Sequence, residues 1–216
     1  MLVNTEQIIE ALFETIQMVS FSLLFSAILG IPLGILLVVT RKDHLLENVV
    51  VFNVLNGIIN IFRSVPFIIL LVAMIPVTRF IVGSSIGTAA AVVPLVFYAG
   101  PYIARLVENS LLEVDPGVLE AAEAMGATPW QVISKFLLPE ALSSLVLALT
   151  IATIGLVGAS AMAGAVGGGG IGDLAITYGY QRFDTITMFI TVAILIVIVQ
   201  GLQSLGNILA KKIRRR

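Results

Sequence analysis

Residues 120–142 read EAAEAMGATPWQVISKFLLPEAL, the one long polar excursion between the third and fourth hydrophobic runs of the chain. A first short helix is predicted to lead into this stretch. Asp115 is a suitable N-cap, and Pro116 follows it at the first helical position, where proline is favoured. Gly126 is a natural C-terminal stop, because glycine readily adopts the left-handed conformation that ends many helices.

A second short helix is predicted to follow directly. Thr128, Pro129 and Gln131 have the spacing of a capping box, in which two side chains satisfy backbone groups at the start of a helix. Pro139 either ends this helix or kinks it, because proline removes one backbone hydrogen bond. Two capped helices between apolar runs indicate a docking element on a membrane protein.

The composition supports a membrane location. Of the 216 residues, 58% are hydrophobic and 12% are charged, whereas soluble domains carry about 25% charged residues. The net charge of −1 provides no field that would attract nucleic acid. The absence of cysteine excludes disulfides and thiolate metal sites. The single histidine, His44, lies in a short charged turn and is expected to be a solvated loop residue, so no metal or cofactor is predicted.

The hydrophobic runs predict five transmembrane helices. Four charge-free intervals exceed the roughly 20 apolar residues that cross a bilayer, and a fifth is interrupted only by Arg63. We therefore predict an all-α integral membrane protein that forms one transmembrane domain over residues 11–207. Its spans are expected at about 15–40, 51–77, 80–104, 141–166 and 185–209, with a polar two-helix loop at about 105–140 between helices 3 and 4.

The basic residues predict an orientation, because cytoplasmic loops are enriched in Lys and Arg. An odd number of spans places the two termini on opposite sides. Nine basic residues fall on one side, in the loops after spans one and three and in the tail KKIRRR, whereas the other side has only Arg79 and Arg182. We expect the N-terminus to face out, the C-terminus to face in, and the loop at 105–140 to lie in the cytoplasm.

The loop resembles the EAA loop of ABC importer permeases. That family has Glu-Ala-Ala, three residues, Gly, nine residues, an aliphatic residue, one residue and then Leu-Pro. Phe136 stands where the family usually has isoleucine, which is a mild departure because both are large and apolar. The resemblance implies that the loop couples the permease to an ATPase through the residues that match the pattern in register, Glu120, Ala121, Ala122, Gly126, Leu138 and Pro139.

The whole chain, over roughly residues 10 to 210, is similar to the methionine-importer permeases of bacterial ABC systems. Stretches that carry this likeness include 59–94, 101–117 and 156–180. The resemblance implies two permease copies in the cell (inner) membrane, two cytoplasmic ATPase subunits and an external methionine-binding lipoprotein. The cargo would be L- and D-methionine; another small amino acid or metabolite is the alternative. The chain itself is not expected to be an enzyme, because it has no phosphate-cradling Walker A motif.

Three residues are candidates for the substrate path: Arg63, Asn60 and Met162. Arg63 is the one charge inside a predicted span, in NIFRSVPF, where Ser64 and Pro66 imply a helix irregularity. Its guanidinium either meets a substrate carboxylate or is a structural group bonded to freed carbonyls or a neighbouring helix. Asn60 shares a helix face with two other asparagines, Asn53 and Asn56, which could line a polar path or hold helices together. Met162 is one of three methionines, with Met74 and Met188, that could line an apolar route.

Other features leave alternatives open. The run AGAVGGGGIG at 163–172 is either a tight packing turn or a movable outer gate. Glu120 and Glu123 share a face of the first loop helix, beside an apolar stripe of Val118, Ala122 and Met125, which suits a protein groove better than an anionic membrane surface. A secondary transporter is a competing class, but its ion coupling usually needs intramembrane carboxylates, and we expect every carboxylate to lie outside the central spans. An integral membrane enzyme is disfavoured because no catalytic constellation converges.

Overall fold

The computed structural model describes residues 2–214, and every regular element in that range is helical. The elements in chain order are α1 (Thr5–Val39), α2 (Val49–Ser64), α3 (Phe67–Ala73), α4 (Ile75–Val82), α5 (Thr88–Leu112), α6 (Pro116–Ala124), α7 (Pro129–Gln131), the π-helical segment η1 (Val132–Leu137), α8 (Leu138–Glu140), α9 (Leu142–Gly164), α10 (Gly170–Leu174), the π-helical segment η2 (Ala175–Gln181) and α11 (Thr185–Arg214).

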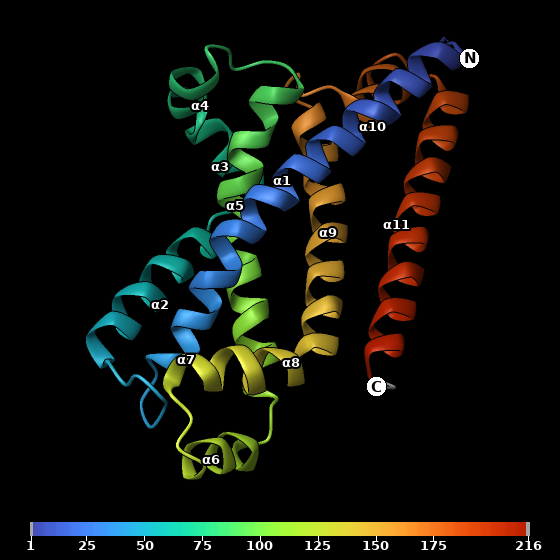
Figure 1. Cartoon of the computed structure of the whole chain (residues 1–216). Helices are drawn as coiled ribbons and strands as arrows, with labels where there is room; N and C mark the ends of the chain where they lie inside the picture. The colour runs from blue at the N-terminus through green and yellow to red at the C-terminus, as the bar shows by residue number, and fades with distance from the viewer. Residues whose placement is uncertain (1, 215–216) are drawn as a thin grey trace.

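Four helices, α1, α5, α9 and α11, are long and apolar enough to cross a membrane. The pair α2 and α3 passes the same test together, although the two are bent by 99° at a short break, so residues 2–214 contain four, or up to five, candidate spans. With 35 residues, α1 is roughly 50 Å long, well beyond the ~30 Å of a hydrocarbon core. It accordingly runs diagonally across α5 and α9 (Figure 1). The predicted all-helical membrane protein is confirmed.

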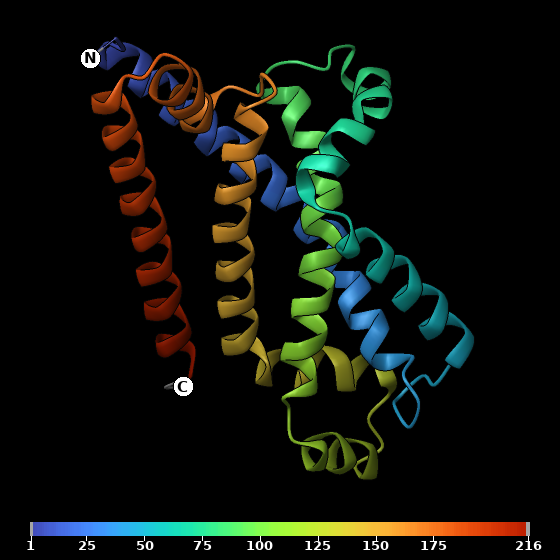
Figure 2. The ribbon, with the colours of Figure 1, turned by 180° about the vertical axis from the view of Figure 1, so that it is seen from behind.

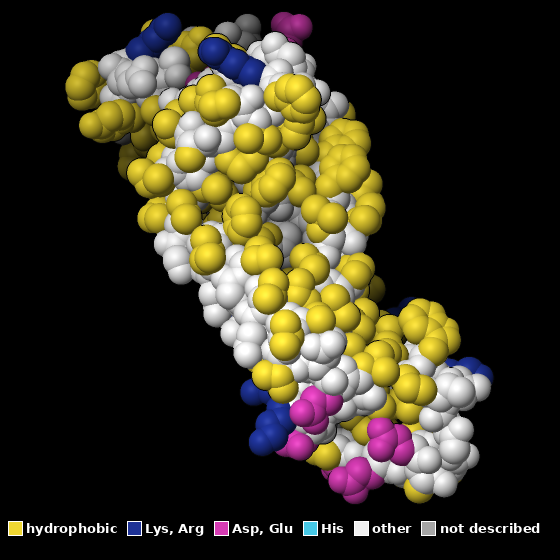
Figure 3. All heavy atoms as spheres, turned by 90° about the vertical axis from the view of Figure 1, so that its left-hand side faces the viewer, with side chains coloured by type: hydrophobic (Ala, Val, Ile, Leu, Met, Phe, Trp, Pro, Cys, Tyr) yellow, Lys and Arg dark blue, Asp and Glu magenta, His cyan; other side chains and the backbone are white. Residues whose placement is uncertain are grey.

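The distribution of apolar and charged side chains on the surface is typical of a membrane-spanning protein. Seen from the side of α2 and α4, apolar side chains form a broad band across the middle of the molecule, and charged side chains gather at its two ends (Figure 3). One charged end carries α6 and the C-terminal end of α11, whereas the N-terminus and α10 lie at the other end (Figure 1). The predicted docking loop and the basic tail therefore belong to the same end of the molecule.

Close packing of α1 on α5 organises the core. A Cβ added to Gly30 would lie 2.6 Å from the carbonyl oxygen of Gly100, and one added to Gly34 would lie 2.6 Å from that of Ala104. The two glycines are four residues apart and share a face of α1, so the helices approach at backbone distance, a packing mode typical of membrane helices. Ile103 and other buried residues of α5 fill the seam toward α9.

The predicted irregularity around Pro66 is confirmed. The helix α2 ends at Ser64, Val65 is extended with ψ of 124°, and α3 begins at Phe67. Pro66 cannot donate a backbone hydrogen bond, so the helical ladder cannot continue through it. The break lies about midway along α5 and α9, where α2 and α3 meet (Figure 2).

The glycine-rich run supports the packing interpretation. A Cβ on Gly164 would collide with the backbone of Asp173, and a Cβ on Gly172 would collide with the backbone of Ala161, so the end of α9 and α10 touch through their backbones. Glu14 of α1 accepts a hydrogen bond of 2.7 Å from the Gly170 N–H. This contact gives the Glu14 carboxylate a hydrogen-bond donor, and it ties α10 to α1.

Candidate functional site

The polar loop forms the two capped helices that its sequence predicts. The Asp115 carboxylate accepts a 2.8 Å hydrogen bond from the Gly117 N–H at the start of α6. Gly126 ends the helix with a φ of 77°, as its type suggested. The Thr128 hydroxyl and the Gln131 side chain form the capping box that opens α7. The loop therefore has a defined shape, which a docking element needs.

Pro139 does not end the second helix. The helical run continues from α7 through η1 and α8 to Glu140, and α9 begins at Leu142. Within this run the segment η1 is π-helical, which is wider than an α-helix: the N–H of Leu138 donates to the carbonyl of Ile133, five residues back. Wider π turns are a known way for a helix to absorb a local disturbance, and this one directly precedes the proline.

The helix α6 has one face toward the protein and one toward solvent. Ala122 is fully buried, and Val118 and Leu119 pack on the cluster formed by α5, η1 and α9. Of the other residues matching the EAA pattern, Leu138 is half-buried and the rest are exposed, namely Glu120, Ala121, Gly126 and Pro139. Met125 is 71% exposed and Trp130 is 73% exposed. Met125 therefore leaves the expected apolar stripe and points outward, which adds apolar surface to an acidic, small-residue face.

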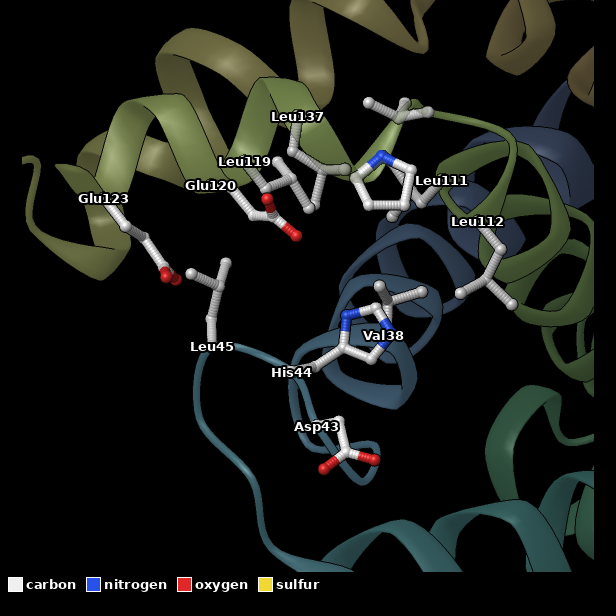
Figure 4. Close-up of a pocket in the computed structure, with 12 residues that line it drawn as sticks. Val38, Asp43, His44, Leu45, Leu111, Leu112, Leu119, Glu120, Glu123 and Leu137 are labelled. Atoms are coloured by element: carbon white, nitrogen blue, oxygen red, sulfur yellow. The ribbon is translucent and has the colours of Figure 1, made fainter. Parts of the chain in front are cut away.

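A cavity of about 440 Å³ separates α6 from the turn between α1 and α2. Glu120 and Glu123 point from α6 toward this space, and His44 and Leu45 line it from the opposite side (Figure 4). His44 is half-buried rather than fully solvated as expected. Burial, with the nearby Arg41 cation, lowers its pKa below the usual 6.5, and Asp43 partly opposes this shift. A neutral imidazole is therefore favoured beside α6.

A polar cluster that the sequence did not reveal joins α2 to α5. The guanidinium of Arg105 donates to Asn56 at 2.6 Å and to Asn60 at 2.8 Å, and it pairs with Glu108 at 2.5 Å. Arg41 approaches the same carboxylate at 3.8 Å. Asn60 thus serves to hold helices together, one of its two predicted roles. The spacing of Arg105 and Glu108, three apart and on one face of a helix, was the available signal.

The cluster surrounds a buried carboxylate near the C-terminal end of α5. The Glu108 side chain is only 3% exposed, and Arg105 and Arg41 both face it. Glu108 lies beyond the span predicted at 80–104, and Glu14 of α1 lies just before the span predicted at 15–40. The expectation that every carboxylate lies outside the central spans therefore stays a prediction.

A second cavity, of about 570 Å³, opens where α2 breaks. It brings together two of the three predicted substrate-path residues, Arg63 and Met162, and excludes Asn60. The sequence did not single out Tyr98 of α5, which forms another wall and meets Phe67 edge-on at 5.2 Å between ring centroids. Within residues 2–214, no cluster of His, Asp and Glu side chains is suited to hold a metal ion.

Comparison with known proteins places the chain among transport components. Residues 30–215 match the family described as the binding-protein-dependent transport system inner membrane component. A probable D-methionine transport system permease protein from Vibrio cholerae is 50% identical over 213 residues, covering 99% of this chain and 95% of the relative. The D-methionine transport system permease protein of Escherichia coli is 54% identical over 157 residues, covering 73% and 72% of the two chains.

Solved structures agree with the sequence relatives. A chain of the MetNI methionine ABC transporter, solved in inward-facing conformations, matches with a TM-score of 0.95 and 47% identity over 97% of both chains. A chain of an amino acid ABC transporter crystallised with histidines has a TM-score of 0.79 at 20% identity, covering 98% of this chain and all of that one. The second likeness concerns the fold alone.

Proposed function

The chain belongs to the family of binding-protein-dependent transport system inner membrane components, and on that premise we propose that it is the permease subunit of an ATP-driven ABC importer for L- and D-methionine. The observation that carries the proposal is the match to the methionine transporter chain, at 47% identity over nearly the whole length. Another small amino acid or metabolite is the alternative cargo. ATP hydrolysis belongs to separate subunits.

The exposed face of α6 is the proposed contact with the ATPase. The small side chain of Ala121 allows close approach, Glu120 and Glu123 offer hydrogen-bond acceptors, and Met125 and Trp130 supply exposed apolar surface. Ala122 and Leu138 instead anchor the loop to the bundle. A short helix fixed in this way can transmit the movement of an ATPase to the spans, because it cannot slide freely on the protein beneath it.

The proposed assembly contains two copies of this chain, two ATPase subunits and an external methionine-binding lipoprotein, in the inner membrane of a bacterium. The N-terminus faces out and the C-terminus faces in, as the basic residues predict. A two-fold dimer is favoured because four or five spans form too small a bundle to enclose a path for a metabolite. The path then lies on the two-fold axis, and ATP binding shifts it between inward-open and outward-open states.

The identity of the cargo can be tested by uptake. Cells that lack their own methionine importers would express this chain with its ATPase and binding protein, and uptake of labelled L-methionine would be followed. Unlabelled L- and D-methionine should compete strongly, and histidine, leucine and alanine should compete weakly. Strong competition by a different amino acid, with little by methionine, would show that the substrate is that amino acid. The assignment as an importer permease would not change.

A further inference from the structure

The cavity at the break of α2 is built differently from the rest of the spanning surface. Its wall includes one guanidinium, one hydroxyl-bearing ring and one thioether, from Arg63, Tyr98 and Met162. It lies at the break between α2 and α3, and this break is about midway along α5 and α9 (Figure 2). Broken helices near the middle of a membrane are common places for transported solutes to bind. Four helices contribute, α2, α3, α5 and α9, so its shape depends on how they pack together.

Arg63 has no hydrogen-bond or ion-pair partner for its guanidinium in the part of the chain that the structure describes. A structural role for Arg63 would require hydrogen bonds to carbonyls freed at the break or to a neighbouring helix. Arg105 has bonds of this kind, because it donates to Asn56 and Asn60 and pairs with Glu108. A charged side chain in a membrane is costly unless it faces protein or water. The exposed guanidinium of Arg63, which lines the cavity, is therefore suited to bind an anionic ligand reversibly.

The break also offers negative potential beside this cation. Because Pro66 has no N–H and the chain bends by 99°, the helical hydrogen bonds of α2 stop at the break, where the Phe62 carbonyl accepts from the Val65 N–H. The C-terminus of a helix carries a partial negative charge. The Tyr98 ring adds an aromatic face of the kind that attracts cations. The cavity thus presents a positive group and a weakly negative region together.

The remaining wall is apolar and roomy. Gly155, Gly158 and Ala159 of α9 leave space opposite the break, and Met162 lies one turn beyond them. A Cβ added to Gly158 would meet nothing within 4 Å. An unbranched side chain can extend along this wall, and a methionine thioether adapts its shape to a flexible ligand.

We propose that this cavity is a substrate-binding site of the permease itself, which holds a zwitterionic α-amino acid with an unbranched apolar side chain. Arg63 binds the carboxylate, the end of α2 and the Tyr98 ring face the ammonium, and Met162 contacts the side chain beside Gly158. The inference rests on the proposed function for the nature of the cargo, but it concerns a contact made after the binding protein has released it.

The test measures binding of labelled L-methionine to the purified permease–ATPase complex without the binding protein. Displacement should be effective with methionine and norleucine and weak with methioninol, which lacks the carboxylate. Arg63→Gln should weaken methionine binding on the order of ten- to hundred-fold, as expected for losing a hydrogen-bonded ion pair. Arg63→Lys should weaken it less, since the charge remains and the two-pronged geometry is lost.

A matched pair of variants tests the location. Gly158→Leu should fill the cavity and abolish binding, whereas Gly201→Leu on α11, where a Cβ also meets nothing within 4 Å, should bind as the unchanged protein does. The inference would be overturned if the unchanged complex did not bind methionine. It would also be overturned if Arg63→Gln and Gly158→Leu both bound methionine as tightly as the unchanged complex does. Uptake of methionine by the complete importer in that case would show that the proposed function survives without this site.

Discussion

Gly126 ends α6, and its backbone conformation determines how the chain turns from α6 toward α7. Its φ of 77° lies in the left-handed region, and a Cβ there would meet no neighbouring atom within 4 Å. Any effect of substitution must therefore come from the backbone rather than from crowding. This isolates the shape of the loop as the quantity that a substitution changes.

Gly126→Val should cost about 1–3 kcal/mol locally, because a β-branched residue strongly disfavours positive φ. We expect the variant to reach the membrane normally but to bind the ATPase weakly or to hydrolyse ATP without uptake. Gly126→Asn is the control, since asparagine tolerates this conformation. Co-purification of the ATPase and methionine uptake provide the readouts, and normal values for Gly126→Val would show that the loop shape does not matter for coupling.

At the scale of elements, the Arg105 cluster should hold α2 against α5. Glu108→Ala leaves a largely buried guanidinium without its carboxylate, which typically costs about 3–5 kcal/mol. In a chain of this size that corresponds to a fall in Tm of roughly 6–20 °C. Thermal unfolding of the purified protein measures the shift. The exposed Glu120→Ala should change Tm by only a degree or two, and an equally small shift for Glu108→Ala would refute the structural role of the cluster.

His44, which lines the cavity between α6 and the turn after α1, should make the folded protein less stable on acidification. Because burial lowers the pKa of His44 in the folded protein, the unfolded chain binds the proton more readily. The cost of protonation is absent above the unfolded pKa of about 6.5 and appears as pH falls below it. Tm measured between pH 7.5 and pH 5 should therefore fall more for the unchanged protein than for His44→Gln. An equal fall in Tm with pH for the unchanged protein and for His44→Gln would contradict this prediction.

For the molecule as a whole, the orientation can be tested with single cysteines, because the chain has none of its own. A cysteine at Thr5 should react with an impermeant thiol reagent in intact cells, and one at Ile213 should not react. Thr5 begins α1 and Ile213 lies in the last turn of α11, and these two helix ends lie at opposite ends of the bundle (Figure 1). The reverse labelling pattern would place α6 on the outer side and remove it from any cytoplasmic ATPase.

Local chemistry explains which parts of the molecule the sequence could predict. Capping side chains, proline and glycine act within a few residues, so the bounds of α6, the capping box of α7 and the break at Pro66 follow from short stretches. The π turn before Pro139 and the cluster around Arg105 depend on contacts between segments that lie far apart in the chain. Tyr98 was missed for the same reason, because only the fold brings it next to Arg63.

ATP dependence of transport tests the central claim most directly. Proteoliposomes containing this chain, its ATPase and its binding protein would be supplied with labelled L-methionine, with ATP on the side of the ATPase or with an ion gradient alone. We predict accumulation with ATP, none with a non-hydrolysable analogue and none with a proton or sodium gradient. Accumulation driven by an ion gradient through this chain without the ATPase would contradict the account and identify a secondary transporter.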